Sequence, residues 1–183
     1  MKMSKLPPML FSILSLSVFV SVNVHANLEQ DCAGSTVTTA DDEFTVSANN
    51  SGLVVHGESE LMWSRCVVGQ TWNADSETCD GEPVRLTWQL ALQLSDEYQF
   101  NDHTDWRVPN LKELASLVER ACVSPSANLT IFPNTPDGNF WTSTPNTSAD
   151  KTTEAWSVAF SNGRIDSRDK QQDYYIRMVR YAE

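Results

Sequence analysis

The sequence has few basic residues. Its 13 Lys and Arg stand against 24 Asp and Glu, which gives a formal net charge of −11. Nucleic acids and anionic membranes are bound through basic patches, so neither is expected as a partner of this chain.

Short motifs that mark catalytic sites are also missing. The chain contains no Gly-x-Ser-x-Gly, no His-Glu-x-x-His and no phosphate-binding glycine loop, and it has only three histidines. The absence of Cys-x-x-Cys argues against structural zinc. We therefore expect a protein that is not an enzyme and that holds no metal and no cofactor. A hydrolase that uses Asp102, His103 and Asp105 is the weaker alternative, because a solvated polar loop is the default structure for such residues.

One apolar run occurs, and it lies at the N-terminus. Lys2 and Lys5 precede a serine-interrupted apolar core, and Val24-His25-Ala26 has the small residues of a cleavage site. The pattern predicts a signal peptide at 1–26, too short in its apolar part for a membrane span. We expect an N-terminal arm at 27–43 and one domain at 44–183, exported to the periplasm, the cell surface or the extracellular space. Removing two lysines and no acid makes the exported chain still more acidic.

The four cysteines are even in number and follow a secretion signal, which favours two disulfides over thiol chemistry. Three pairings are formally possible. Cys66 and Cys79 are close in sequence and flank a turn-rich segment, so we pair them and assign Cys32 to Cys122 by elimination.

The hydrophobic pattern predicts strands, then two helices, then strands again. Alternation predicts strands at 44–47, 53–56, 61–66, 140–143, 155–160, 164–167 and 174–180, and a periodicity near 3.6 predicts helices at 87–98 and 111–121. Ser161-Asn162-Gly163 predicts a hairpin turn between the strands at 155–160 and 164–167. This order is typical of an α+β domain with a mostly antiparallel sheet. The prolines and asparagines from Cys122 to Gly138 predict a long irregular loop, a candidate for function.

The junction from Asp105 to Glu113 joins an extended segment to a helix. Pro109 disfavours helix at the residue before it, Asn110 is a good N-cap, and Glu113 is spaced to complete a capping box. We expect Arg107, and likewise Arg177 further on, to pair with carboxylates at a sheet edge, with Asp105 as one candidate partner. Five of the six tryptophans are expected in the core: Trp63, Trp88, Trp106, Trp141 and Trp156.

Several blocks in order resemble the Lcl C-terminal domain family, named for the Legionella collagen-like adhesin. They are Leu61-Met62-Trp63-Ser64-Arg65-Cys66, Gly69-Gln70-Thr71-Trp72, Asp105-Trp106-Arg107-Val108-Pro109-Asn110 with Lys112-Glu113-Leu114, Phe140-Trp141-Thr142-Ser143, and Ile176-Arg177-Met178-Val179-Arg180. The resemblance implies a C-type-lectin-like fold, related to that of formylglycine-generating enzymes. In that fold Asp105, Trp106, Arg107, Pro109, Asn110, Glu113, Trp141, Arg177 and Arg180 are structural.

The chain departs from the collagen-like adhesin in two ways: it has no Gly-x-y repeats, and its acidity disfavours the sulfated glycosaminoglycans that the adhesin binds. The calcium motifs of true C-type lectins are also broken, since Glu82-Pro83 runs into Val84 and Trp72-Asn73 into Ala74. Asp41, Asp42 and Glu43 remain possible weak calcium ligands, although a charge run is usually a solvated surface.

The remaining tryptophan, Trp72, lies in the polar segment between Cys66 and Cys79, where a rigidly held aromatic ring can stack on a sugar or a protein. We therefore take Trp72, Asn73 and Asp75 as candidate ligand-binding residues. The function we expect is an exported, adhesin-like binding domain that recognises a glycan or a surface protein, with unknown oligomeric state. The alternative from another class is a periplasmic accessory protein in envelope or appendage assembly.

Overall fold

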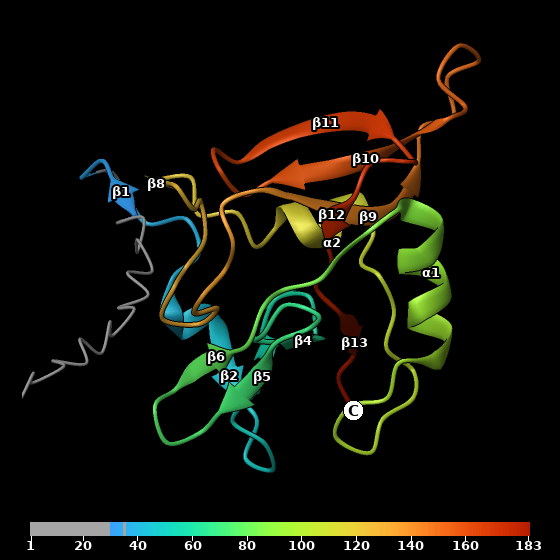
Figure 1. Cartoon of the computed structure of the whole chain (residues 1–183). Helices are drawn as coiled ribbons and strands as arrows, with labels where there is room; N and C mark the ends of the chain where they lie inside the picture. Colours follow the sequence, from blue (N-terminus) through green and yellow to red (C-terminus); the bar gives the residue numbers. More distant parts are fainter. Residues whose placement is uncertain (1–29, 35) are drawn as a thin grey trace, which may run out of the picture.

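A computed structural model describes residues 30–34 and 36–183. The predicted signal peptide at 1–26 lies outside these residues. Antiparallel strands dominate the described chain, and two helices lie beside them (Figure 1). The expected α+β class, with mostly antiparallel sheet, is therefore confirmed.

The larger sheet has five strands in the order β11-β10-β9-β12-β7. Their bounds are β7 Arg85–Leu86, β9 Asn139–Pro145, β10 Glu154–Ala159, β11 Arg164–Asp169 and β12 Tyr174–Tyr175. All neighbours are antiparallel except β12 and β9. Gly163 has a φ of +71° in the turn between β10 and β11, a conformation that glycine adopts without steric cost, and this confirms the hairpin expected there.

The second sheet has four antiparallel strands in the order β13-β4-β3-β2. They are β2 Phe44–Val46, β3 Leu53–His56, β4 Leu61–Ser64 and β13 Val179–Tyr181. Two small pairs complete the strands: β1 Asp31–Cys32 with β8 Cys122–Val123, and β5 Thr71–Asn73 with β6 Thr78–Asp80. A short 3-10 helix, η1, covers Asp41–Glu43.

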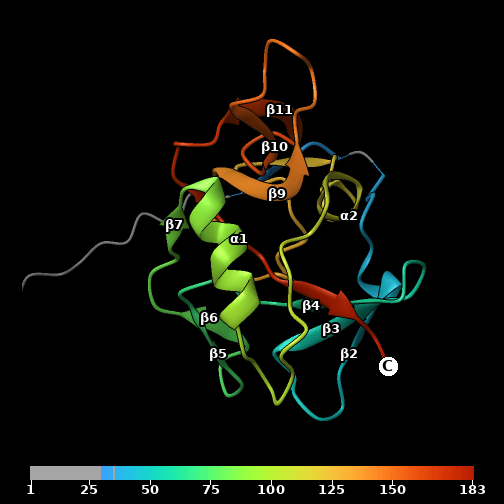
Figure 2. The same cartoon turned by 90° about the vertical axis from the view of Figure 1, so that its right-hand side faces the viewer.

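Helix α1 spans Trp88–Glu97 and runs alongside the larger sheet next to β7 and β9 (Figure 2). Its inward residue Ala91 is fully buried. Trp63, Trp106 and Trp141 are buried as expected, whereas Trp88 and Trp156 are only half-buried. Three of the five predicted core tryptophans therefore lie in the core.

Helix α2 covers only Leu111–Ala115, so the prediction of a helix to residue 121 is wrong. The backbone leaves the helix because it finds other partners: Val118 pairs with Ala127, and the Glu119 N–H donates to the carbonyl of Ser126. Glu119, which lies beyond the end of the helix, is 3% exposed.

The C-terminal strand predicted at 174–180 is also wrong as one element. It is split into β12 and β13, which belong to different sheets, and Ile176, Arg177 and Met178 connect them. These three residues are buried at the junction of the two sheets. The three residues therefore cross the core from one sheet to the other and do not continue a single strand.

Both predicted disulfides are confirmed. Cys32 bonds to Cys122, and Cys66 bonds to Cys79. The first ties the N-terminal arm to the domain at β1 and β8. A second attachment follows, since the Glu119 carboxylate accepts hydrogen bonds from the backbone N–H groups of Thr38 and Thr39 at 2.9 Å each. The described part of the arm is thus held by the disulfide and by Glu119.

Candidate functional site

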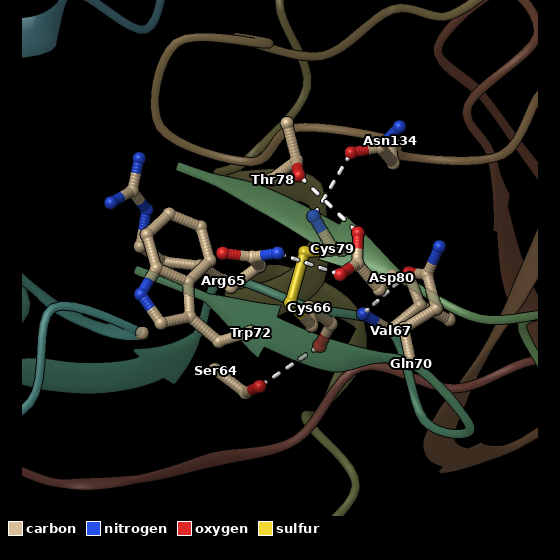
Figure 3. Close-up of a disulfide and its surroundings, with 12 residues drawn as sticks. Ser64, Arg65, Cys66, Val67, Gln70, Trp72, Thr78, Cys79, Asp80 and Asn134 are labelled. Atoms are coloured by element: carbon tan, nitrogen blue, oxygen red, sulfur yellow. Dashed lines mark hydrogen bonds between the residues drawn. A yellow bond between two sulfur atoms is a disulfide. The ribbon is translucent and has the colours of Figure 1, made fainter. Parts of the chain in front are cut away.

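Strands β5 and β6 form a hairpin, residues 71–80, that we call the Trp72 hairpin (Figure 3). Trp72 lies directly opposite Cys79, whose disulfide to Cys66 anchors the hairpin to the end of β4. The turn is closed by Asn73, whose side-chain oxygen accepts from the backbone N–H of Asp75 at 3.1 Å. The disulfide and the turn hydrogen bond therefore both hold the hairpin in place.

The indole of Trp72 is half-buried and held on several sides. Its Nε1–H donates to Ser51 Oγ at 2.9 Å, and the Arg65 guanidinium lies 4.1 Å from the ring centre. Gly52 lies so close that an added Cβ would be 2.8 Å from the ring atom Cγ. The aromatic ring is therefore preorganised, with its polar group already satisfied and part of its surface open to solvent.

Arg65, which covers the ring, is itself 5% exposed. Its Nε and Nη2 donate to the carbonyls of Ile131 and Thr130, each at 2.8 Å, and its Nη1 donates to the carbonyl of Ser51 at 3.0 Å. Burial lowers the pKa of Arg65, although Glu77 partly opposes this shift. The guanidinium thus fastens the loop after Cys122 to the indole.

Arg177 holds the same loop from inside the core. Its Nη1 donates to the carbonyls of Ser64 and Arg65, and its Nη2 donates to Thr135 Oγ1 at 2.8 Å. The guanidinium also lies 4.7 Å from the ring centre of Phe132. Burial lowers its pKa to about 9, which still leaves it charged at neutral pH.

The expectation that Arg177 pairs with a carboxylate is therefore wrong, since within the described residues its partners are carbonyl and hydroxyl oxygens. The reason is its place between β12 and β13: there it faces the backbone of the segment after β4 and the loop after Cys122, rather than a sheet edge.

The three predicted ligand-binding residues do not converge on one face. Successive strand residues point to opposite sides, so Asn73 faces away from the side of Trp72. Asn73 Nδ2 donates to Asp80 Oδ2 at 2.8 Å, which commits its amide to the hairpin. Asp75 is exposed at the turn. Trp72 thus lies on the side of the hairpin that faces Arg65, whereas Asn73 lies on the outer side and Asp75 lies at the tip.

The junction at 105–113 has the expected capping box: the Asn110 side chain accepts from the Lys112 and Glu113 N–H groups, and Glu113 accepts from the Asn110 N–H. Arg107 pairs with a carboxylate, as expected, but the partner is Glu113, through two bonds of 2.7 and 2.8 Å. Burial of Glu113 favours its neutral form, but bonds from Arg107 and Asn110 outweigh it and lower its pKa.

Asp105 binds a different arginine. Arg180 Nε donates to Asp105 Oδ1 at 2.8 Å, and this hydrogen bond is the main reason that the pKa of Asp105 is lowered. Arg107 forms an isolated antiparallel bridge with Val179, so the junction also extends the four-stranded sheet beyond β13. These contacts give the junction a structural role.

The residues of the hydrolase alternative lie in the loop between α1 and this junction. Phe100 and His103 exchange backbone hydrogen bonds, so Asn101 and Asp102 form a tight turn with positive φ at both positions. Asp105 is engaged by Arg180. Asp41, part of the acidic run at 41–43, accepts a hydrogen bond from Asn128 at 2.7 Å.

Among residues 30–34 and 36–183, no group of three or more His, Cys, Asp or Glu is arranged to hold a metal ion. In the same residues, no helix combines the length and the apolar character that crossing a membrane requires.

Sequence reasoning missed Ser51, Gly52 and Arg65 as parts of the site. Arg65 entered the sequence analysis only as part of a motif. A basic residue between a strand and a cysteine is a weak signal for a buried arginine, because its partners are carbonyl groups that a sequence does not reveal.

These features define a class of protein: an α+β domain with two disulfides that presents a disulfide-anchored hairpin on a mostly antiparallel scaffold. The two disulfides are compatible with an oxidising compartment. The chain belongs to the Lcl C-terminal domain family, whose model matches residues 52–180. That family is adhesin-related. A comparison with curated proteins finds no significant match.

Proposed function

We propose that this chain is an exported, non-catalytic binding domain of adhesin type that recognises a glycan or a surface protein through the Trp72 hairpin. The observation that carries the proposal is the half-exposed indole of Trp72, fixed by Ser51 and Arg65 beside a disulfide. Rigid aromatic side chains supply large contact area at low entropic cost, and they stack on sugar rings and on protein partners alike. Membership of an adhesin-related family supports the same function.

Export is part of the proposal. The N-terminal sequence has the features of a signal peptide, and two disulfides persist where the surroundings are oxidising. The sites that fit are the periplasm, the cell surface and the extracellular space.

The charge of the hairpin narrows the ligand class. Asp75, Glu77, Asp80 and Glu82 are exposed on or next to it. A sulfated polyanion approaching this surface would be repelled by these four exposed carboxylates. The ligand is therefore a neutral glycan or a protein surface with basic residues.

The second candidate, an accessory protein in envelope or appendage assembly, uses the same surface for a protein ligand. A hydrolase on Asp102, His103 and Asp105 has less support, because Asp105 is held in an ion pair with Arg180.

The test combines a glycan array with affinity capture from intact cells and extracellular matrix. Three proteins are compared: the wild type, Trp72→Ala, and His103→Ala as the matched control in another loop. Binding that falls at least about tenfold in Trp72→Ala and is unchanged in His103→Ala supports the proposal, the size being that of a binding hot spot. Circular dichroism and a thermal melt establish that each variant is folded.

The pattern of ligands separates the candidates. Binding to neutral glycans supports the adhesin-type function, whereas silence on sugars with reproducible capture of one envelope protein supports the accessory role. Wild-type binding that survives Trp72→Ala unchanged would falsify the assignment of the site. A hydrolytic activity lost in His103→Ala would replace the proposal with the third candidate.

A further inference from the structure

Strand β11 is the outer strand of the larger sheet and has β10 on one side only (Figure 1). Its six residues make it longer than the outer strands β2 and β7, which have three and two. The opposite edge of β11 presents backbone donors and acceptors without a strand partner in the described chain. Such an edge is a template for another strand.

The register shows which backbone groups face outward. The Lys170 N–H donates to the carbonyl of Thr153, and Ser157 Oγ donates to the carbonyl of Asp166, so residues 166 and 170 direct their backbone groups toward β10. In an antiparallel ladder the direction alternates along the strand. The N–H and C=O groups of Ile165 and Ser167, and the N–H of Asp169, therefore point away from the sheet.

The side chains along this edge alternate in charge. Arg164, Asp166 and Arg168 share one face, and Arg168 Nη2 lies 3.2 Å from Asp166 Oδ2. Ser167, small and polar, stands between them on the opposite face. Like charges on an edge strand oppose pairing, but alternating charges can complement themselves when the strand meets its own copy in the antiparallel sense.

We propose that β11 pairs with β11 of a second copy of this chain, antiparallel, about a two-fold axis that passes through Ser167. Outward groups meet outward groups when Ser167 lies opposite the partner's Ser167 and Ile165 opposite the partner's Asp169. Asp166 then lies opposite the partner's Arg168 in a non-hydrogen-bonded position, where cross-strand side chains come closest. The symmetry makes two such ion pairs, and the sheet continues from one copy into the other.

Both neighbouring registers place like charges opposite one another at the two-fold axis. A shift of two residues toward the start of the strand sets Asp166 against the partner's Asp166 and Arg164 against the partner's Arg168. A shift of two residues toward the end of the strand sets Arg168 against the partner's Arg168, although it also brings Asp166 opposite the partner's Lys170. A parallel pairing in register sets every charge against its own kind. In the proposed register one like pair, Arg164 and the partner's Lys170, falls at each end. The Lys170 ammonium is directed elsewhere, since it donates to the Thr152 carbonyl and lies 4.7 Å from the Trp88 ring centre.

An interface of this size is weak, because six residues per copy bury less surface than a standard stable complex. The dimer therefore depends on concentration. Figures 1 and 2 place β11 at one end of the molecule and the Trp72 hairpin toward the other. Pairing leaves both hairpins free, so a dimer at a crowded surface would engage a repetitive ligand through two sites. The inference goes beyond the proposed function and stands without it.

Sedimentation velocity of the purified protein from about 10 µM to about 1 mM, the range of weak association, tests the proposal. The wild type is expected to shift from monomer to dimer. Asp166→Arg places arginines opposite one another and is expected to weaken the dimer at least about tenfold, as is Arg168→Asp. The double variant Asp166→Arg/Arg168→Asp exchanges the charges and is expected to recover the dimer.

Circular dichroism of the single variants guards against a trivial loss of fold, since both residues lie at the outer margin of the sheet. Hydrogen exchange gives a second readout: the Ser167 amide should slow as the concentration of the wild type rises. A wild type that remains monomeric at about 1 mM would overturn the proposal, as would a dimer indifferent to Asp166→Arg. A folded double variant that fails to recover the dimer would overturn it too.

Discussion

Arg177 donates from Nη1 to the backbone carbonyl of Arg65, and Arg65 in turn donates to the backbone of the loop after Cys122. The two guanidinium groups therefore form a chain from the core to the surface. At its inner end Arg177 crosses between the two sheets, and at its outer end Arg65 lies against Trp72. The position of a surface aromatic ring thus depends on a fully buried charge.

Replacing Arg177 tests that dependence. Arg177→Met keeps most of the volume but leaves the carbonyls of Ser64 and Arg65 and the hydroxyl of Thr135 without their donor. We expect the free energy of unfolding to fall by about 3 kcal/mol or more, because hydrogen bonds to a charged group are lost and their acceptors stay buried. Urea unfolding measures this, with the exposed Arg120→Met as a control expected within about 0.5 kcal/mol. Equal stability of the two variants would contradict the role given to Arg177.

How far the sequence predicts this structure depends on the range of the interactions. The capping box of Asn110 and Glu113 was predicted because both partners lie within four residues. The hairpin at Gly163 and the pairing of Cys66 with Cys79 followed in the same way from local turn chemistry and spacing, whereas Cys32 and Cys122 were paired by elimination. Local signals of this kind survive folding when nothing distant competes with them.

The predictions that were wrong concern residues whose interaction partners are distant in the sequence. The helix does not continue after Ala115, because Val118 pairs with Ala127 and the Glu119 side chain binds Thr38 and Thr39, about 80 residues earlier. Arg177 is buried against the carbonyl groups of Ser64 and Arg65, 113 and 112 positions away, and the hydroxyl group of Thr135, 42 positions away. An amphipathic pattern cannot show either contact, since a buried carboxylate and a buried guanidinium look like solvent-facing residues until the chain that covers them is placed.

Glu119 holds the N-terminal arm at Thr38 and Thr39, and replacing Glu119 should loosen this part of the arm. Its carboxylate accepts from the N–H and hydroxyl groups of Thr38 and Thr39 and from the Ala121 N–H. In Glu119→Gln an amide NH₂ replaces one acceptor, so we expect a loss of about 1 to 3 kcal/mol in the free energy of unfolding. Hydrogen exchange at the Thr38 and Thr39 amides should accelerate. The exposed Glu97→Gln is the control, and unchanged exchange in Glu119→Gln would remove Glu119 from this role.

The same carboxylate predicts sensitivity to acid. Burial of Glu119 favours protonation, but hydrogen bonds from the backbone of Ala121, Thr39 and Thr38 outweigh it, so its pKa is lowered in the folded state. A lowered pKa contributes stability that is present above the unfolded value, about 4.3, and is lost as the pH falls toward the folded value. The midpoint of unfolding, measured from about pH 7 to about pH 3, should therefore decrease once the pH is below about 4.5. The decrease should be less steep in Glu119→Gln than in the wild type. Parallel curves for the two proteins would count against this cause.

The two disulfides should contribute unequally. Cys66 and Cys79 are 13 residues apart and Cys32 and Cys122 are 90 apart. On the loop-entropy model, Cys66→Ser/Cys79→Ser costs about 3 kcal/mol and Cys32→Ser/Cys122→Ser about 4 to 5. The short bridge has the greater effect on ligand binding, since it anchors the Trp72 hairpin. Urea unfolding and ligand titration of both double variants separate the two effects, and a long-bridge variant with the larger binding loss would contradict this assignment.

Gly52 has no side chain, which allows the Trp72 ring to pack closely against its backbone. Adding a single methyl group at Gly52 tests whether this close packing matters. In Gly52→Ala the new Cβ would lie 2.8 Å from Trp72 Cγ and 2.9 Å from Trp72 Cβ, so the indole must move. Gly57→Ala is a matched control, because its Cβ meets nothing nearer than the Glu43 carbonyl at 3.5 Å. We expect Gly52→Ala to lose about 1 to 3 kcal/mol through overpacking, with a changed tryptophan signal in near-ultraviolet circular dichroism. Gly57→Ala should keep both the stability and the spectrum. If ligand affinity falls in Gly52→Ala and not in Gly57→Ala, binding depends on the position of the Trp72 ring and not only on its presence.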